Sequence, residues 1–175
     1  IPELAGTLHC ALGLSPVAHG RLTGMALDTI RAMPGVVMVI TPDDIPGPNE
    51  CGSIVHDDPI LCDGEVRYLG QPVFAVVART RDAARRAAAK AKDKGVLTIE
   101  PLPPVLTPQQ AHALGQYVLP PMHLERASTE GGAQAAIARA PHRLRESFSV
   151  GGQEQFYLEG QISYAIPKED GGMHL

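Results

Sequence analysis

Short apolar runs, separated by glycine, proline and polar residues, fill most of the first hundred positions of the chain. Runs of about five to eight apolar and β-branched residues are typical of strands. The clearest run, Val73–Ala78, is apolar throughout, as in a strand that is buried on both faces. We therefore predict strands at residues 7–14, 20–26, 36–40, 66–69, 72–79 and 96–100, with many turns between them.

Alanine recurs at helical spacing between the last two of these strands. Five small side chains share one face of a predicted helix at residues 81–93: Ala83, Ala84, Ala87, Ala88 and Ala91. Thr80 suits the N-cap of this helix, and Gly95 suits the C′ position. Strand, helix and strand within about thirty residues are typical of a right-handed βαβ crossover. We expect a split or mixed sheet with its helices on one face.

Weaker signals cover the rest of the chain. Asp28 is a candidate N-cap for one helical turn through Ala32, and short helices are predicted at 108–113 and 132–140. Residues 41–63 are rich in proline and glycine, which predicts a long loop of a kind that is often functional. Residues 142–150 alternate between polar and apolar side chains, which predicts a strand.

The charge balance excludes some partners. The 15 Lys and Arg against 19 Asp and Glu leave a net charge of -4, which offers no general attraction to nucleic acid or anionic lipid. Three Phe, four Tyr and no Trp leave little material for a base-stacking surface. No apolar run approaches the roughly 20 residues that span a bilayer. We expect neither a nucleic-acid nor a membrane partner.

Cysteine and histidine usage points away from metal binding by side chains. The chain has an odd number of cysteines and no C-x-x-C pair, which disfavours both a disulfide framework and a zinc site; the three are Cys10, Cys51 and Cys62. This usage fits a reducing cytoplasm. The seven histidines are dispersed without ligand spacing, so we expect ordinary packing or surface roles for them.

The paired glycines Gly151 and Gly152 open the one segment that suggests chemistry, because glycine permits the close approach of a ligand or another backbone. They precede Gln153, whose amide offers two donors and one acceptor in a plane. One interpretation is a bulge or turn at the start of a strand, with Gln153 and Glu154 in solvent. The other is that Gln153 donates a hydrogen bond to an electron-rich oxygen held above the glycines.

Five segments in order, LHCALGLSPVAHGRL, MPGVVMVITPDDIPG, GEVRYLGQPVFAVVA, EPLPPVLTP and GGQEQFYLEGQ, carry a family resemblance over essentially the whole chain. The chain resembles the molybdenum-binding large subunits of bacterial xanthine dehydrogenases. These belong to the molybdenum hydroxylases, together with aldehyde oxidases and carbon monoxide dehydrogenases. The resemblance implies an α+β fold. An α/β hammerhead domain with a mixed sheet and packed helices would occupy residues 1–137, and residues 138–175 would be the first strands of a molybdopterin-binding domain.

The resemblance also implies a site. Gln153 would hydrogen-bond the oxo ligand of molybdenum, with Gly151 and Gly152 beside the cofactor, while the pterin rather than the protein holds the metal. The family's catalytic glutamate and substrate-pocket residues match no position here, so neither Glu154 nor Glu159 takes a catalytic role. Gln155 stands where many relatives have histidine, which favours the bacterial two-subunit type.

The implied parent enzyme oxidises xanthine or hypoxanthine to urate with water as oxygen source, and passes electrons through a partner subunit carrying 2Fe-2S clusters and FAD to NAD. The alternatives are a non-catalytic scaffold, or a parent that acts on aldehydes or other N-heterocycles. We expect this chain to be a piece of that parent, inactive and without a bound cofactor by itself. Its strands from residue 142 onward would lack partners, which predicts self-association.

Overall fold

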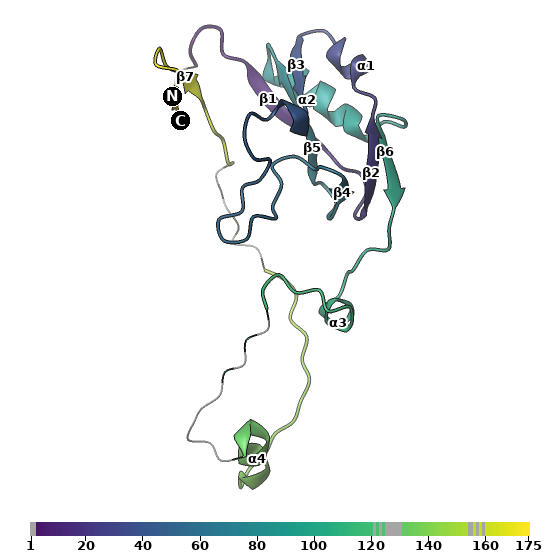
Figure 1. Ribbon diagram of the computed structural model, residues 1–175, viewed down its shortest axis with the longest axis vertical. Helices are drawn as coiled ribbons and strands as arrows, with labels where there is room; N and C mark the ends of the chain where they lie inside the picture. The colour runs from purple at the N-terminus through teal and green to yellow at the C-terminus, as the bar shows by residue number, and fades with distance from the viewer. Residues whose placement is uncertain are drawn as a thin grey trace. The chain divides into compact units, whose positions relative to one another are not determined.

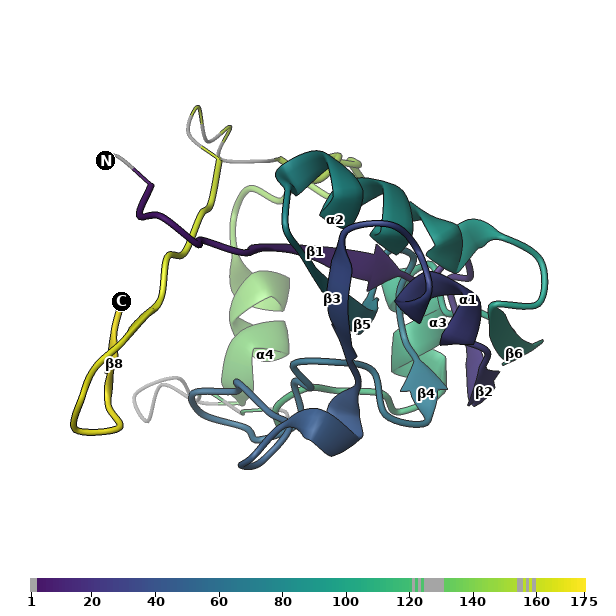
Figure 2. The same cartoon turned by 90° about the horizontal axis from the view of Figure 1, so that it is seen from above.

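Figures 1 and 2 show the computed structural model, which describes residues 3–120, 122, 124, 131–153, 156, 158 and 160–175. The chain forms two compact units, Ile1–Pro120 and Pro121–Leu175. Every described residue that is buried belongs to the first unit.

Six strands and three short α-helices build the first unit. The strands are β1 (His9–Leu14), β2 (Gly20–Met25), β3 (Val36–Ile40), β4 (Glu65–Val66), β5 (Pro72–Ala78) and β6 (Leu97–Pro101). The helices are α1 (Asp28–Arg31), α2 (Arg81–Ala88) and α3 (Pro108–Ala113), with 3-10 turns η1 (Pro42–Asp44) and η2 (Ala89–Lys92). The predicted strands are confirmed except at 66–69, where Val66 alone lies in a strand, as the second residue of β4.

The strands form two separate sheets, ordered β1-β5-β3 and β4-β2-β6, and each pair is antiparallel. The predicted βαβ crossover is therefore wrong, because β5 and β6 lie in different sheets. Helix α2 connects a strand of one sheet to a strand of the other, and not two parallel strands of the same sheet. Sheets packed with helices confirm the α+β class.

Helix α2 lies over β1 and β5, as both views show. The Thr80 hydroxyl accepts a hydrogen bond from the Ala83 amide at 3.1 Å, which confirms the predicted N-cap. The predicted alanine face is buried, and the α-helix continues as η2 to Lys92. Alanine methyl groups let the helix approach the sheet closely. Gly95 has a φ of 85°, the left-handed conformation expected of a glycine after a helix.

The core between the sheets and α2 is centred on Phe74, which is fully buried. Its ring fills the space beside Gly13 on β1, where a Cβ would overlap it. The predicted N-cap at Asp28 is wrong, since the helical turn begins one residue earlier, with Leu27 as N-cap. Asp28 instead accepts a hydrogen bond from Arg31 at 3.0 Å.

The second unit has little regular structure among its described residues. It contains α4 (Gly132–Arg139) and a hairpin of β7 (Ile166–Pro167) and β8 (Met173–His174). The strand predicted at residues 142–150 is wrong: these residues form no strand, because no described segment pairs with their backbone. Their alternating pattern meets one condition for a strand, and a hydrogen-bonding partner is the other.

Candidate functional site

The glycine pair that the sequence singled out lies in the second unit. Gly151, Gly152 and Gln153 are exposed and belong to no helix or strand. Neither glycine has a positive φ, and a Cβ at either would meet no heavy atom of another described residue within 4 Å. The conformation and packing of the described residues therefore do not by themselves call for glycine at these two positions.

Gln153 carries a free amide. Within the described part of the chain, no residue forms a hydrogen bond with its side chain, which is open to solvent. Two N–H donors and one carbonyl acceptor remain available for an external oxygen-rich group. The rest of the motif, at Glu154, Gln155, Tyr157 and Glu159, lies outside the described residues.

The described residues of the motif offer a side-chain amide and backbone groups as hydrogen-bonding partners. Among the residues that the structure describes, no group of three or more His, Cys, Asp or Glu side chains is placed to hold a metal ion. A neutral amide beside two glycines is suited to donate to an oxygen of a large bound group that approaches the backbone closely.

The histidines of the first unit take structural roles. His19 lies between the Pro103 carbonyl, 2.7 Å from its Nδ1, and Glu65, 3.3 Å from its Nε2. His19 thereby ties the connector after β6 to the beginning of β2. His56 Nδ1 lies 2.9 Å from Glu50 in the long loop. Neither contact was predicted from the sequence, because both join residues whose spacing carries no signal.

The long loop at residues 41–63 is ordered by side-chain to backbone hydrogen bonds. The Asp44 carboxylate accepts hydrogen bonds from both the amide and the hydroxyl of Thr41, each at 2.8 Å, and these bonds hold the pKa of Asp44 below its ordinary value. The side-chain amide of Asn49 donates a hydrogen bond to the Leu61 carbonyl at 2.7 Å and accepts one from the Leu61 amide at 3.0 Å. These contacts give the loop a structural role in the first unit.

The thiols show no activation. Cys62 is fully buried, and burial is the largest of the causes that raise the pKa of its thiol, with Asp63 adding to the effect. The pKa of Cys10 is also raised by desolvation. A raised pKa disfavours the thiolate that a nucleophile or metal ligand requires.

Two family descriptions match the sequence. "Aldehyde oxidase and xanthine dehydrogenase, a/b hammerhead domain" matches residues 2–93, and "Molybdopterin cofactor-binding domain" matches residues 116–175. The chain belongs to the aldehyde oxidase and xanthine dehydrogenase family. The second match includes Gly151, Gly152 and Gln153, whereas every buried residue of the main core cluster except Val96 falls in the first match.

Individual relatives carry both names of the family. The chain is 31% identical to a xanthine dehydrogenase/oxidase of Gallus gallus over 100% of its own length, and 37% identical to aldehyde oxidase 2 of Rattus norvegicus over 97%. It spans 12% of the length of each of these relatives.

Solved structures of the family share the fold. The chain is similar to the aldehyde oxidoreductase of Desulfovibrio gigas, with a TM-score of 0.57 and 33% identity over 62% of this chain and 13% of that one. It is also similar to quinoline 2-oxidoreductase of Pseudomonas putida 86, with a TM-score of 0.53 and 28% identity over 67% and 15% of the two chains. None of the described helices has the length and apolar character needed to cross a membrane.

Proposed function

We propose that this chain supplies the scaffold and one cofactor contact of a molybdenum hydroxylase whose substrate is a purine, xanthine or hypoxanthine. The observation that carries the proposal is the exposed Gly151-Gly152-Gln153 segment inside the region matched by the molybdopterin cofactor-binding domain. Because the chain spans 12% of the length of the relatives it matches, the activity is proposed for the complete protein.

Gln153 has a defined role in this proposal. Its amide N–H would donate a hydrogen bond to an oxygen of the bound cofactor, and Gly151 and Gly152 would let the cofactor approach the backbone. When bound, the molybdopterin cofactor supplies the two-electron oxidation. Once the complete protein holds this exposed amide in place, the side chain would contribute an oriented donor, which lowers the cost of reorganisation during the reaction.

The remaining parts of the proposal concern the complete protein. We place the end of the hammerhead domain at residue 137 and the opening of the molybdopterin-binding domain at residues 138–175, a boundary that lies within the region 116–175 matched by the second family description. A partner subunit with 2Fe-2S clusters and FAD carries the electrons to NAD, and the enzyme works in the cytoplasm. The bacterial two-subunit type is supported by Gln155 at the position where many relatives have histidine.

Aldehyde oxidation is the second candidate function. It is favoured by the 37% identity to an aldehyde oxidase, which exceeds the 31% identity to a xanthine dehydrogenase/oxidase. The third candidate function is a non-catalytic scaffold. It is favoured because the buried core of this chain lies in the first unit, far from the glycine pair in the sequence.

The deciding experiment expresses the complete reading frame together with its partner subunit. Molybdenum content is measured by elemental analysis, and turnover is measured with xanthine, hypoxanthine and an aromatic aldehyde. The proposal predicts purine turnover by protein loaded with molybdenum. Turnover of aldehydes alone would select the second candidate, and a folded, loaded protein that oxidises neither class would overturn the enzyme assignment.

A further inference from the structure

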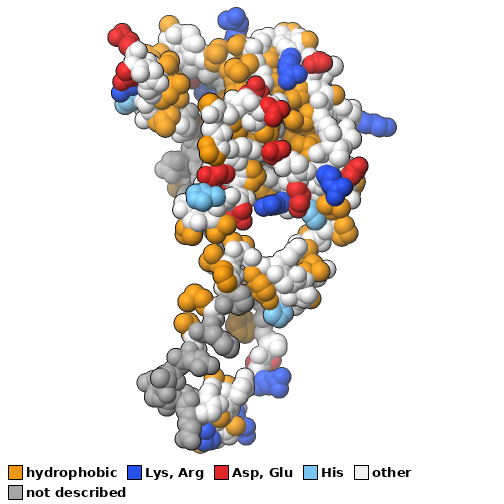
Figure 3. Space-filling model, viewed as in Figure 1, with side chains coloured by type: hydrophobic (Ala, Val, Ile, Leu, Met, Phe, Trp, Pro, Cys, Tyr) orange, Lys and Arg blue, Asp and Glu red, His pale blue; other side chains and the backbone are white. Residues whose placement is uncertain are grey.

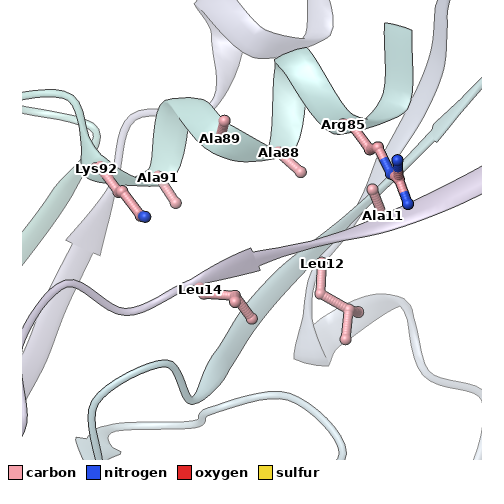
Figure 4. A pocket seen from close by; sticks show the side chains of 8 residues that line it. All are labelled: Ala11, Leu12, Leu14, Arg85, Ala88, Ala89, Ala91 and Lys92. Carbon is pink, nitrogen blue, oxygen red and sulfur yellow. The ribbon is translucent and has the colours of Figure 1, made fainter. Parts of the chain in front are cut away.

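Two open hollows in the surface of the first unit differ in the chemistry of the groups that line them. One, of about 230 Å³, lies between β1 and the helix formed by α2 and η2, with Arg85 and Lys92 at the ends of a row of alanines (Figure 4). Its lining consists of alkyl groups and two cations, which do not react with one another. Another, of similar volume, is lined by residues of β2, of η1 and of the segment before β4. It includes Asp63 and Gly64, a carboxyl group followed by a glycine amide.

The sequence contains two such Asp-Gly pairs, Asp63–Gly64 and Asp170–Gly171. In an Asp-Gly pair the aspartyl side chain condenses readily with the next backbone amide, because glycine has no Cβ to hinder the approach. The dipeptide alone does not distinguish the two pairs. Their surroundings in the structure do.

Both reactive groups of Asp63–Gly64 are exposed and without hydrogen-bonding partners among the described residues. Figure 3 shows acidic side chains beside basic ones on the first unit, and several of these form ion pairs, such as Arg21 with Glu100. Within the described part of the chain, the Asp63 carboxylate forms neither an ion pair nor a hydrogen bond, and the Gly64 amide donates to no acceptor. The carboxyl group and the amide nitrogen are therefore free to approach each other.

In Asp170–Gly171 both groups are engaged. The Gly171 amide donates a hydrogen bond to the Lys168 carbonyl at 3.2 Å. An oxygen of the Asp170 carboxylate accepts a hydrogen bond from the Gly172 amide at 2.9 Å. Condensation at this pair must first break both hydrogen bonds of the turn between β7 and β8, so the structure favours reaction at Asp63–Gly64.

We propose that Asp63 and Gly64 form a site of spontaneous covalent modification, at which Asp63 converts to isoaspartate. The Gly64 nitrogen attacks Cγ of Asp63. An N–Cγ bond forms, a Cγ–O bond breaks, and the oxygen leaves as water with the amide proton and a carboxyl proton. Water then opens the succinimide ring by cleaving the bond between that nitrogen and the main-chain carbonyl carbon of Asp63. The product has the composition of the original chain, and neither step needs an oxidant or a reductant.

The modification lengthens the backbone between two fixed points. On one side, Cys62 is fully buried and its amide donates a hydrogen bond to the Pro72 carbonyl at 2.7 Å. On the other side, the Gly64 carbonyl accepts a hydrogen bond from the Leu22 amide at 2.8 Å, and Val66 is fully buried. An isoaspartyl linkage adds a carbon atom to the chain between these points, which disturbs the contact between β4 and β2. We therefore expect the modified chain to be less stable.

The test incubates the 175-residue chain at neutral pH and physiological temperature, beside synthetic peptides of residues 60–67 and 167–174 as unfolded references. Peptide mapping with electron-transfer fragmentation distinguishes isoaspartate from aspartate, which have the same mass. Isoaspartate at Asp63 should form in the folded chain within about threefold of the rate in its peptide, because no hydrogen bond must open first. Asp170 should fall further behind its own peptide.

Four variants test the chemistry of the pair. Gly64→Ala should slow the reaction at Asp63 at least about fivefold, because a Cβ hinders the attacking nitrogen. Asp63→Asn should react faster than the wild type, with loss of ammonia in place of water. Asp63→Glu keeps the charge but requires a larger ring, so it should remain unmodified at this position. The matched control, Gly171→Ala, should leave the rate at Asp63 unchanged.

A rate at Asp63 that is at least about tenfold lower in the folded chain than in the peptide would overturn the proposal. So would an unchanged rate in Gly64→Ala, or a greater lag at Asp63 than at Asp170. Gly64 has a φ of 89°, where alanine is strained, so circular dichroism must show that Gly64→Ala is folded. If it is not, Asp63→Asn decides, since a folded variant that releases no ammonia would overturn the proposal. Incubation should also lower the melting temperature of the wild type more than that of Asp63→Glu, and equal losses would overturn the expected destabilisation.

Discussion

The two units of the chain have similar sequence patterns and very different structures. In Ile1–Pro120 the apolar runs pair into two sheets around a buried core, whereas no described residue of Pro121–Leu175 is buried. Leu144, Phe148 and Val150 alternate as in a strand but are 102%, 88% and 71% exposed. The difference teaches that an alternating pattern specifies which face a strand would bury, and that the strand forms only where a partner is present.

The largest expected effect contrasts two phenylalanines. Phe74 is fully buried and Phe148 is 88% exposed. Phe74→Ala should lower the free energy of unfolding by about 3 to 5 kcal/mol, because it removes a large side chain and leaves a cavity. Phe148→Ala should change it by no more than about 0.5 kcal/mol. Urea unfolding of the two variants measures both values, and similar losses would break the contrast between the units.

The next effect concerns the proposed cofactor contact in the complete enzyme. Gln153→Ala should reduce turnover about ten- to a thousandfold, the range for loss of one oriented donor, with little change in melting temperature. Gln134→Ala, an exposed glutamine on α4, is the matched control and should retain wild-type turnover.

Molybdenum content must be equal in the Gln153 variant, its control and the wild type, because loss of cofactor would lower turnover for another reason. Glu154→Ala should have a smaller effect than Gln153→Ala. Wild-type turnover by fully loaded Gln153→Ala, together with a melting temperature several degrees lower, would show that Gln153 serves the structure of the segment instead.

A third prediction concerns self-association of the 175-residue chain. Exposed apolar residues without strand partners favour pairing between copies, so multi-angle light scattering should detect a dimer or larger species. The double variant Leu144→Asp/Phe148→Asp should shift the distribution toward the monomer. A monodisperse wild-type monomer at high protein concentration would contradict the prediction.

The smallest effect concerns acid stability. The Thr41 hydrogen bonds hold the pKa of Asp44 below its ordinary value, so folding favours the ionised carboxylate. That contribution is fully present above the unfolded carboxyl pKa of about 3.9 and is lost as the pH falls through the lower folded pKa. Asp44→Asn should therefore destabilise the chain at neutral pH and make its stability less dependent on pH below about 4. Urea unfolding at several pH values measures this, with Asp43→Asn as the neighbouring control, which should leave the acid dependence of the wild type unchanged.

The sequence alone determined the local elements whose signals lie close together along the chain. Helix α2 follows from the alanine spacing and from Thr80, and β1, β2, β3 and β5 follow from their apolar runs. The five ordered segments also indicated the family, because a family resemblance is carried by residue identities and does not require the structure. Gln153 was predicted as a site residue from the same segments, and the described structure adds that its amide is exposed.

Which elements contact one another could not be read from local patterns. The order of β5, α2 and β6 suggested a βαβ crossover within a split or mixed sheet, yet β5 pairs with β1 and β3 while β6 pairs with β2. Residues 142–150 form no strand, and β1 packs against α2, which follows it by about seventy positions in the sequence. The physical reason is that side-chain periodicity fixes which face of an element is apolar, whereas pairing depends on backbone hydrogen bonds and packing between segments that are distant in sequence.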